Sequence, residues 1–175
     1  MILGGNWGAS AEECSTQLAC DRLLPTASLR MHRAISVQAP SSLVFLWLCQ
    51  LKLAPYSYDL LDNFGRKSPQ QLANGLDQLE AGQRFMTIFS LVSFCRDAHI
   101  TLRSRRVAVT YAVSAQGSAT RLLVRVIFDP PGARVGATLL GNALALGDLV
   151  MMRKQLLTLK ALAERDAVGL RAAEP

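Results

Sequence analysis

The sequence GDLVMMRKQLLTLKALAER, residues 147–165, carries the clearest periodicity in the chain. Its apolar residues recur at helical spacing along one stripe: Leu149, Met152, Leu156, Leu159 and Ala163. The polar residues Lys154, Gln155, Thr158 and Arg165 fall on the far side. A helix with one apolar stripe buries that stripe against another element. The stretch therefore predicts a long C-terminal helix, and the residues before it should form the surface that receives its apolar face.

The start of this helix is less regular than its body. Gly136, Gly141 and Gly147 interrupt the upstream pattern, which leaves residues 134–147 open between helix and loop and favours a start near Leu144. Asp148 has two interpretations. Together with Asn142 and Arg153 it could give a cavity a polar end, but a favourable charge in the first turn of the helix is the preferred one.

The central part of the chain alternates with the period of β-strands. Residues 32–39 place Ile35, Val37 and Ala39 on one face and end at Pro40. Residues 84–95, 99–104, 107–114 and 122–128 then read as a meander of at least four antiparallel strands. Between the first strand and the meander, residues 41–54 predict a helix capped by Ser41 or Ser42, and residues 57–63 a short second helix.

The order of elements predicts an α+β fold. A curved antiparallel β-sheet would wrap around the long C-terminal α-helix, with one or two short helices after the first strand. Residues 1–30 are expected to form an N-terminal arm across the outside of the domain, with Ser10 and Glu13 as a capping box. Residues 31–166 form the main domain and residues 167–175 a polar C-terminal tail.

Composition sets limits on the classes of function. The chain has 175 residues, of which 50% are hydrophobic, enough for one domain with a full core. The net charge of +6 is scattered, and we interpret the group Arg103, Arg105 and Arg106 as a solvated turn, so no nucleic-acid partner is expected. No secretory signal, membrane span, metal-ligand spacing or cofactor fingerprint is recognisable, and the four separated cysteines favour reduced thiols and a cytoplasmic location.

The predicted order of elements, with residues 148–164 laid across the sheet, resembles the helix-grip fold of the START and birch-pollen-allergen superfamily, SRPBCC. Shorter segments resemble its bacterial polyketide cyclase and lipid-transport-like members, most of which have no assigned activity. These segments are Trp7-Gly8-Ala9, Glu12-Glu13, Arg33-Ala34-Ile35, Ala39-Pro40, Trp47-Leu48-Cys49-Gln50-Leu51, Tyr56-Ser57-Tyr58-Asp59, Asp62-Asn63, Gly82-Gln83 and Met152-Arg153-Lys154-Gln155-Leu156. The resemblance covers residues 7–164 and implies a lipid, polyketide or aromatic metabolite bound in an internal cavity.

A cavity in such a fold lies where the concave face of the sheet meets the C-terminal helix. The side chains expected to bind a ligand there are Trp47, Tyr56, Phe89, Val109, Tyr111, Val124, Val126, Leu149 and Met152. Each is equally well explained as core packing between sheet and helix. Because Met151 and Met152 are adjacent on a helix, only one of them is expected to contact a ligand.

Tyr58 and Asp59 are the candidate catalytic residues, in a cluster expected to roof the cavity mouth. A phenol beside a carboxylate can transfer a proton, as a polyketide cyclase or dehydratase requires. The structural alternative, in which Asp59 caps a helix or pairs with Arg66, is favoured.

Three functions remain open from the sequence. The first is binding of a hydrophobic small molecule, and the second is a cyclase or dehydratase reaction using Tyr58 and Asp59. The third is a non-catalytic association through the outer face of the sheet, such as a homodimer, because both faces of residues 84–95 are largely apolar.

Overall fold

A curved seven-stranded sheet with the order β1-β2-β7-β6-β5-β4-β3 forms the centre of the computed structural model. The structure describes residues 3–58, 65, 67–129 and 137–173, and for residues 137–140 and 173 the backbone alone. Strands β2 (Leu29–Val37), β4 (Phe89–Cys95), β5 (His99–Arg103), β6 (Val107–Gln116) and β7 (Ala119–Phe128) supply most of the sheet. They pair in antiparallel fashion, and β1 (Asn6–Trp7) adds to β2 in parallel.

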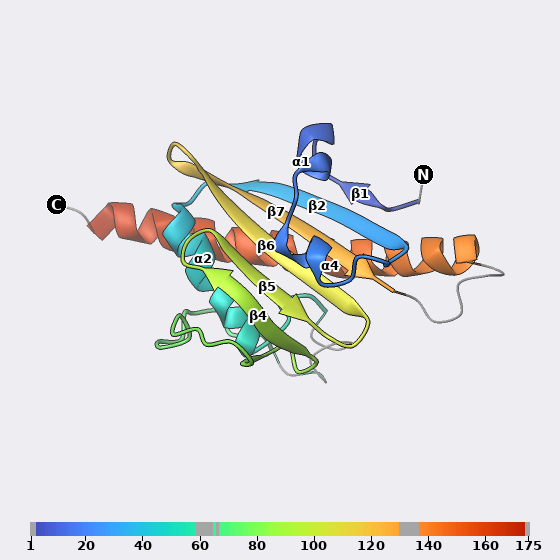
Figure 1. Cartoon of the computed structure of the whole chain (residues 1–175). Coiled ribbons are helices and arrows are strands. Elements are labelled where there is room, and N and C mark those ends of the chain that lie inside the picture. The colour runs from blue at the N-terminus through green and yellow to red at the C-terminus, as the bar shows by residue number, and fades with distance from the viewer. Residues whose placement is uncertain (1–2, 59–64, 66, 130–136, 174–175) are drawn as a thin grey trace.

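Helix α4 (Ala137–Ala173) runs along one face of the sheet (Figure 1). The buried side chains Met152, Leu156, Leu159 and Ala163 confirm the stripe predicted from the sequence, and Leu149 is half-buried. Helix and sheet together form the helix-grip α+β fold that the order of elements predicts.

The expected start of this helix near Leu144 is wrong. The helix begins at Ala137 and includes Gly141 and Gly147. Asp148 therefore lies well inside the helix, where no free backbone N–H groups surround it, and its interpretation as a first-turn charge is wrong as well. The boundary predicted at residue 167 falls within the same helix.

Helix α2 (Ser41–Cys49) and the 3-10 turn η2 (Gln50–Lys52) follow β2 and pack between sheet and α4. From Leu43 to Cys49 every side chain of α2 is apolar, as expected of a helix in the core. The predicted serine cap is absent, since the N-cap is Pro40, whose carbonyl accepts from the backbone of Leu43 and Val44. The helix predicted over residues 57–63 falls largely outside the described residues.

The long strand predicted over residues 84–95 is interrupted. Strand β3 (Arg84–Phe85) turns back at once and pairs with the start of β4. The turn residues Met86 and Thr87 have φ angles of 45° and 67°, a left-handed region that glycine and asparagine usually occupy. This turn brings residues 86–88 to the edge of the space between sheet and α4.

The N-terminal arm lies on the face of the sheet opposite α4, in front of the strands in Figure 1. Its helix α1 (Ala11–Ser15) has the predicted capping box between Ser10 and Glu13. The 3-10 turn η1 (Ala19–Arg22) inserts Cys20 against Ala108 and Ile127, forming a second small core. Within the described residues, no helix has the length and apolarity needed to span a membrane.

Candidate ligand-binding site

A pocket of about 470 Å³ lies between the sheet and α4. Strands β6 and β7 form one wall, the β3–β4 turn forms the rim, and α4 covers the other side. Its described lining consists of Pro55, Ser57, Met86, Thr87, Ile88, Phe89, Val107, Val109, Tyr111, Val126, Asp148, Met151, Met152 and Gln155. Most of these side chains are apolar, so the polar ones determine what the pocket can recognise beyond hydrophobicity.

The sheet wall consists of two neighbouring rows of side chains. In one row, Val109 and Val126 stand opposite each other on β6 and β7. In the next row, Tyr111 is paired with Val124, and Val124 with Arg33 of β2. Because residues in register across adjacent strands share a face, Arg33 points to the same side as the pocket wall.

Helix α4 contributes Asp148, Met151, Met152 and Gln155. Their spacing of i, i+3, i+4 and i+7 forms one helical face, which lies next to the core stripe and shares Met152 with it. The expectation that only one methionine faces the cavity is therefore wrong, because Met151 and Met152 flank the midline of this second face. Gln155, predicted on the solvent side, is buried there.

A hydrogen-bonded network holds Gln155 in place at the pocket. Tyr111 Oη donates to Gln155 Oε1 over 2.7 Å, and Gln155 Nε2 donates to the carbonyl of Pro55 over 2.6 Å. The same nitrogen lies 3.4 Å from Met86 Sδ. Burial raises the pKa of Tyr111 well above its usual range. The phenol is therefore neutral and keeps the proton that it donates to Gln155.

Arg33 and Asp148 form a buried ion pair, and the Asp148 side chain is part of the pocket lining. Arg33 is fully buried, and its Nη2 donates to Asp148 Oδ2 over 2.8 Å. Nη2 also reaches the carbonyl of Ala145 at 3.3 Å, and Nη1 donates to the carbonyl of His32 at 2.8 Å. Arg33 Nε has no hydrogen-bond partner among the described residues.

Two opposing effects act on the Asp148 carboxyl. Burial raises its pKa to about 6, although the charge and hydrogen bond of Arg33 oppose the rise. At neutral pH the carboxylate is therefore mainly ionised and paired, but close to its titration range. A carboxyl group with such a pKa in an apolar site can accept a proton or a hydrogen bond from a bound molecule.

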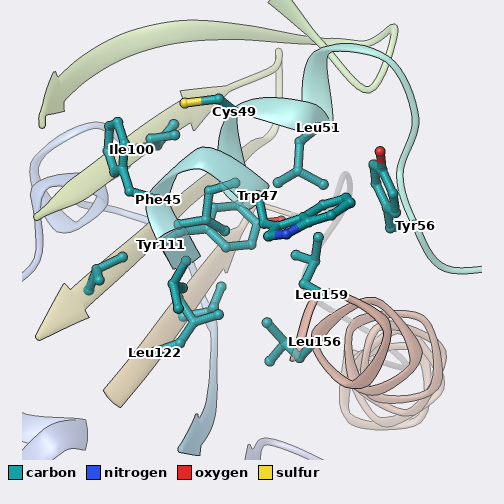
Figure 2. Packing of buried hydrophobic residues seen from close by; sticks show 14 of the residues in the cluster. Phe45, Trp47, Cys49, Leu51, Tyr56, Ile100, Tyr111, Leu122, Leu156 and Leu159 are labelled. Carbon is teal, nitrogen blue, oxygen red and sulfur yellow. The ribbon is translucent and has the colours of Figure 1, made fainter. Parts of the chain in front are cut away.

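The nine residues predicted to bind a ligand fall into two groups. Phe89, Val109, Tyr111, Val126 and Met152 line the pocket. Trp47, Tyr56, Val124 and Leu149 are not among its lining residues. Trp47 and Tyr56 pack edge to face at 5.9 Å between ring centroids, and Figure 2 shows them in the core with Leu159 of α4 nearby. Trp47 Nε1 donates to Asp166, which further fixes this ring as a packing residue.

The two candidate catalytic residues are not assembled in the pocket by the described structure. Tyr58 is 40% exposed and is not among the lining residues, whereas its neighbour Ser57 is. Asp59 lies outside the described residues. Catalysis by this pair stays a prediction.

Arg33 and Gln155 were missed as site residues, and Asp148 was considered and set aside. The sequence did contain a signal for Arg33. This residue precedes Ile35 and Val37 by two and four residues in the same strand, so its side chain must lie on the same inward face. An inward-facing arginine needs a buried acceptor, and Asp148 is the one acidic residue in the largely apolar stretch of residues 135–152. Gln155 gave no comparable signal, because its position on the helix wheel fits the solvent side of the stripe. In the part of the chain that the structure describes, no three His, Cys, Asp or Glu side chains group as metal ligands.

Comparison with known proteins gives a likeness in structure only. No protein-family model matches the chain, and no curated protein matches it in sequence. A protein from Nitrosomonas europaea has 12% identity and a TM-score of 0.50, over 86% of this chain and 99% of its own. A protein from Chromobacterium violaceum has 13% identity and a TM-score of 0.46, over 77% of this chain and 97% of its own.

A third solved structure, a Polyketide_cyc-like protein from Corynebacterium glutamicum, has 16% identity and a TM-score of 0.39, over 83% of this chain and 95% of its own. At these identities the likeness concerns the fold and not the activity. The chain is thus similar in fold to the protein from Nitrosomonas europaea, whose length it covers almost completely.

Proposed function

We propose that this protein binds a hydrophobic small molecule, such as a lipid, polyketide or aromatic metabolite, in the pocket between the sheet and α4. The observation that carries the proposal is the pocket itself. Its volume of about 470 Å³ and its mostly apolar lining match the size and chemistry of small-molecule sites. Resemblance of the sequence to the SRPBCC superfamily supports the same function, and we propose membership of that superfamily with it.

The alternative, a pocket without a ligand, leaves the apolar lining side chains in contact with water. A bound apolar molecule removes this surface from water, which is favourable. Here the flexible side chains Met86, Met151 and Met152 surround the volume without closing it. Methionines adapt their shape to varied apolar groups, which suits a binding site.

A cytoplasmic location is part of the proposal. It rests on the four cysteines, Cys14, Cys20, Cys49 and Cys95, all of which are free. Free thiols are typical of a reducing compartment.

The experiment is native mass spectrometry of the purified protein, followed by extraction and identification of any small molecule bound to it. Val107→Trp should block the pocket, because Val107 is a half-buried lining residue on a strand that tolerates aromatic side chains. Val92→Trp is the matched control, since Val92 lies exposed on β4 and is not among the lining residues.

We expect the mass of a protein–ligand complex for the wild type and Val92→Trp, and the mass of the free protein alone for Val107→Trp. If extraction yields nothing, apolar probes are titrated into the same three proteins. Equal binding by all three, or binding by none, would contradict the proposal.

A further inference from the structure

The side chains of Tyr111, Asp148 and Gln155 in the pocket lining have spare hydrogen-bond acceptors and no spare donors, and the unpaired Nε of Arg33 belongs to a residue outside the lining. Tyr111 gives its only proton to Gln155, which leaves lone pairs on the phenol oxygen. The Gln155 amide nitrogen is engaged by Pro55 and Met86. Asp148 is acceptor-only when ionised, and among the described residues Arg33 is its single hydrogen-bond partner, at one oxygen.

Among the described residues, the pocket lining carries a negative charge and no positive one. Asp148 is the one ionised side chain among the described lining residues, since its partner Arg33 is not part of the lining. The guanidinium of Arg33 is already held by Asp148, Ala145 and His32. A second carboxylate brought into the pocket would therefore meet a like charge in an environment of low dielectric constant.

From this arrangement we infer that the pocket selects apolar ligands that carry a hydrogen-bond donor, such as an alcohol, phenol or amine, and discriminates against ligands that carry a carboxylate. The inference rests on the proposed binding function and deepens it by naming the polar group of the ligand. The donor would bind to the Asp148 carboxylate while the apolar body lies along Val109, Val126 and Met152. Free fatty acids are thereby disfavoured relative to fatty alcohols or hydroxylated ring systems.

Three probes with the same alkyl chain test this: decanol, decyl methyl ether and decanoate. Decanol donates a hydrogen bond, the ether only accepts one, and decanoate is an anion. Affinities are measured by isothermal titration calorimetry at about pH 8, above the pKa of about 6 for Asp148. Decanol should bind about tenfold or more tightly than the ether, since a hydrogen bond to a charged group contributes at least that factor. Decanoate should bind more weakly than the ether.

Substitution of Asp148 should change the order of the affinities of the three probes. In Asp148→Asn the Arg33 charge loses its counterion, so decanoate should gain about tenfold or more in affinity. The advantage of decanol over the ether should shrink, because the amide oxygen accepts a hydrogen bond but carries no charge. Asp166→Asn makes the same change on α4 outside the pocket lining and should leave the order as in the wild type. If Asp148→Asn does not fold, the double variant Arg33→Met/Asp148→Leu replaces the pair with apolar side chains. In that variant decanol and the ether should bind equally.

The outcomes distinguish a failure of the inference from a failure of the proposed function. If the ether binds but decanol binds no more tightly, or if decanoate binds best to the wild type, the inference is wrong and the binding function stands. Preference for decanol that survives in the double variant also overturns it. Failure of all three probes to bind contradicts the function and the inference together.

Discussion

At the scale of single residues, the buried pair of Arg33 and Asp148 joins strand β2 to helix α4. Removing one partner of a buried ion pair leaves an uncompensated charge, whereas replacing both with apolar side chains is often neutral. We expect Asp148→Leu to lower the free energy of unfolding by about 3 kcal/mol or more. Arg33→Met should cost less, because the remaining carboxyl can take up a proton. The double variant should lie within about 1 kcal/mol of the wild type.

Urea denaturation of the four proteins measures this coupling as a double-mutant cycle. Costs that simply add in the double variant would contradict the direct pairing of the two side chains.

The same carboxyl predicts a dependence of stability on pH. The pKa of Asp148 is about 6 in the folded protein and 3.8 for a free aspartate side chain. Between these values the folded protein keeps a proton that the unfolded chain has released, so the free energy of unfolding falls as pH rises from about 4 to about 6 and is level above. The full effect is on the order of 2 to 3 kcal/mol.

Urea midpoints of the wild type and Asp148→Asn, taken between about pH 4 and pH 8, isolate this contribution as their difference. Glu13, whose pKa is lowered to about 2 mainly by its hydrogen bond with Arg121, acts in the opposite direction but is common to both proteins. A difference that is constant across this range would contradict the raised pKa of Asp148.

At the scale of elements, α4 carries two adjacent helical faces. The core face could be predicted from the sequence because apolar residues recur at the right spacing. The pocket face could not, because Asp148 and Gln155 look like solvent-facing residues until tertiary contacts supply their partners. The β3–β4 turn was hidden for a related reason: Met86 and Thr87 are not turn formers, and the alternation of apolar residues runs through them.

A glycine inside α4 offers a test of the continuous helix. A Cβ built at Gly147 meets no atom within 4 Å, and the residue lies in the helix interior. Gly147→Ala should therefore raise the free energy of unfolding by about 1 kcal/mol, the usual difference in helix propensity.

The contrasting substitution is Gly8→Ala. There φ is +77° and a Cβ would lie 2.2 Å from the carbonyl oxygen of Ala34, so this change should destabilise the protein strongly. Thermal unfolding of both variants measures the two effects. No gain in Gly147→Ala would mean that the helix does not run continuously through this position.

At the scale of the whole molecule, Arg125 joins the N-terminal arm to the outer face of the sheet. All of its N–H groups point to partners, which are Asp21, His32 and the carbonyls of Glu13, Cys14 and Thr16. Arg125→Lys keeps the charge but loses the planar set of five donors. We expect a loss of about 2 to 3 kcal/mol and faster proteolytic cleavage within the arm.

Limited proteolysis with identification of the first cut site measures the opening of the arm. Arg30→Lys is a suitable control, because Arg30 also binds Asp21 but is more exposed. A cut pattern that is the same in Arg125→Lys and the wild type would contradict the role of Arg125 in holding the arm.

The global architecture was more predictable than the site. Strand alternation, the proline after β2 and the terminal stripe were enough for the helix-grip order, because these patterns reflect which face of each element is buried. Which of the buried side chains border a pocket depends on how tightly helix and sheet approach. Val124 and Val126 share a strand and a face, yet of the two only Val126 lines the pocket.

Binding of an apolar molecule between the sheet and α4 can be followed by methyl NMR spectroscopy during titration with decyl methyl ether. We predict that the largest shift changes occur at methyl groups of the pocket lining: Val107, Val109, Val126, Met151 and Met152. Methyl groups of Val92, Val150 and Val168, which are exposed and not among the lining residues, should stay unchanged. Shift changes confined to those exposed positions, or none at any position, would contradict binding in the pocket.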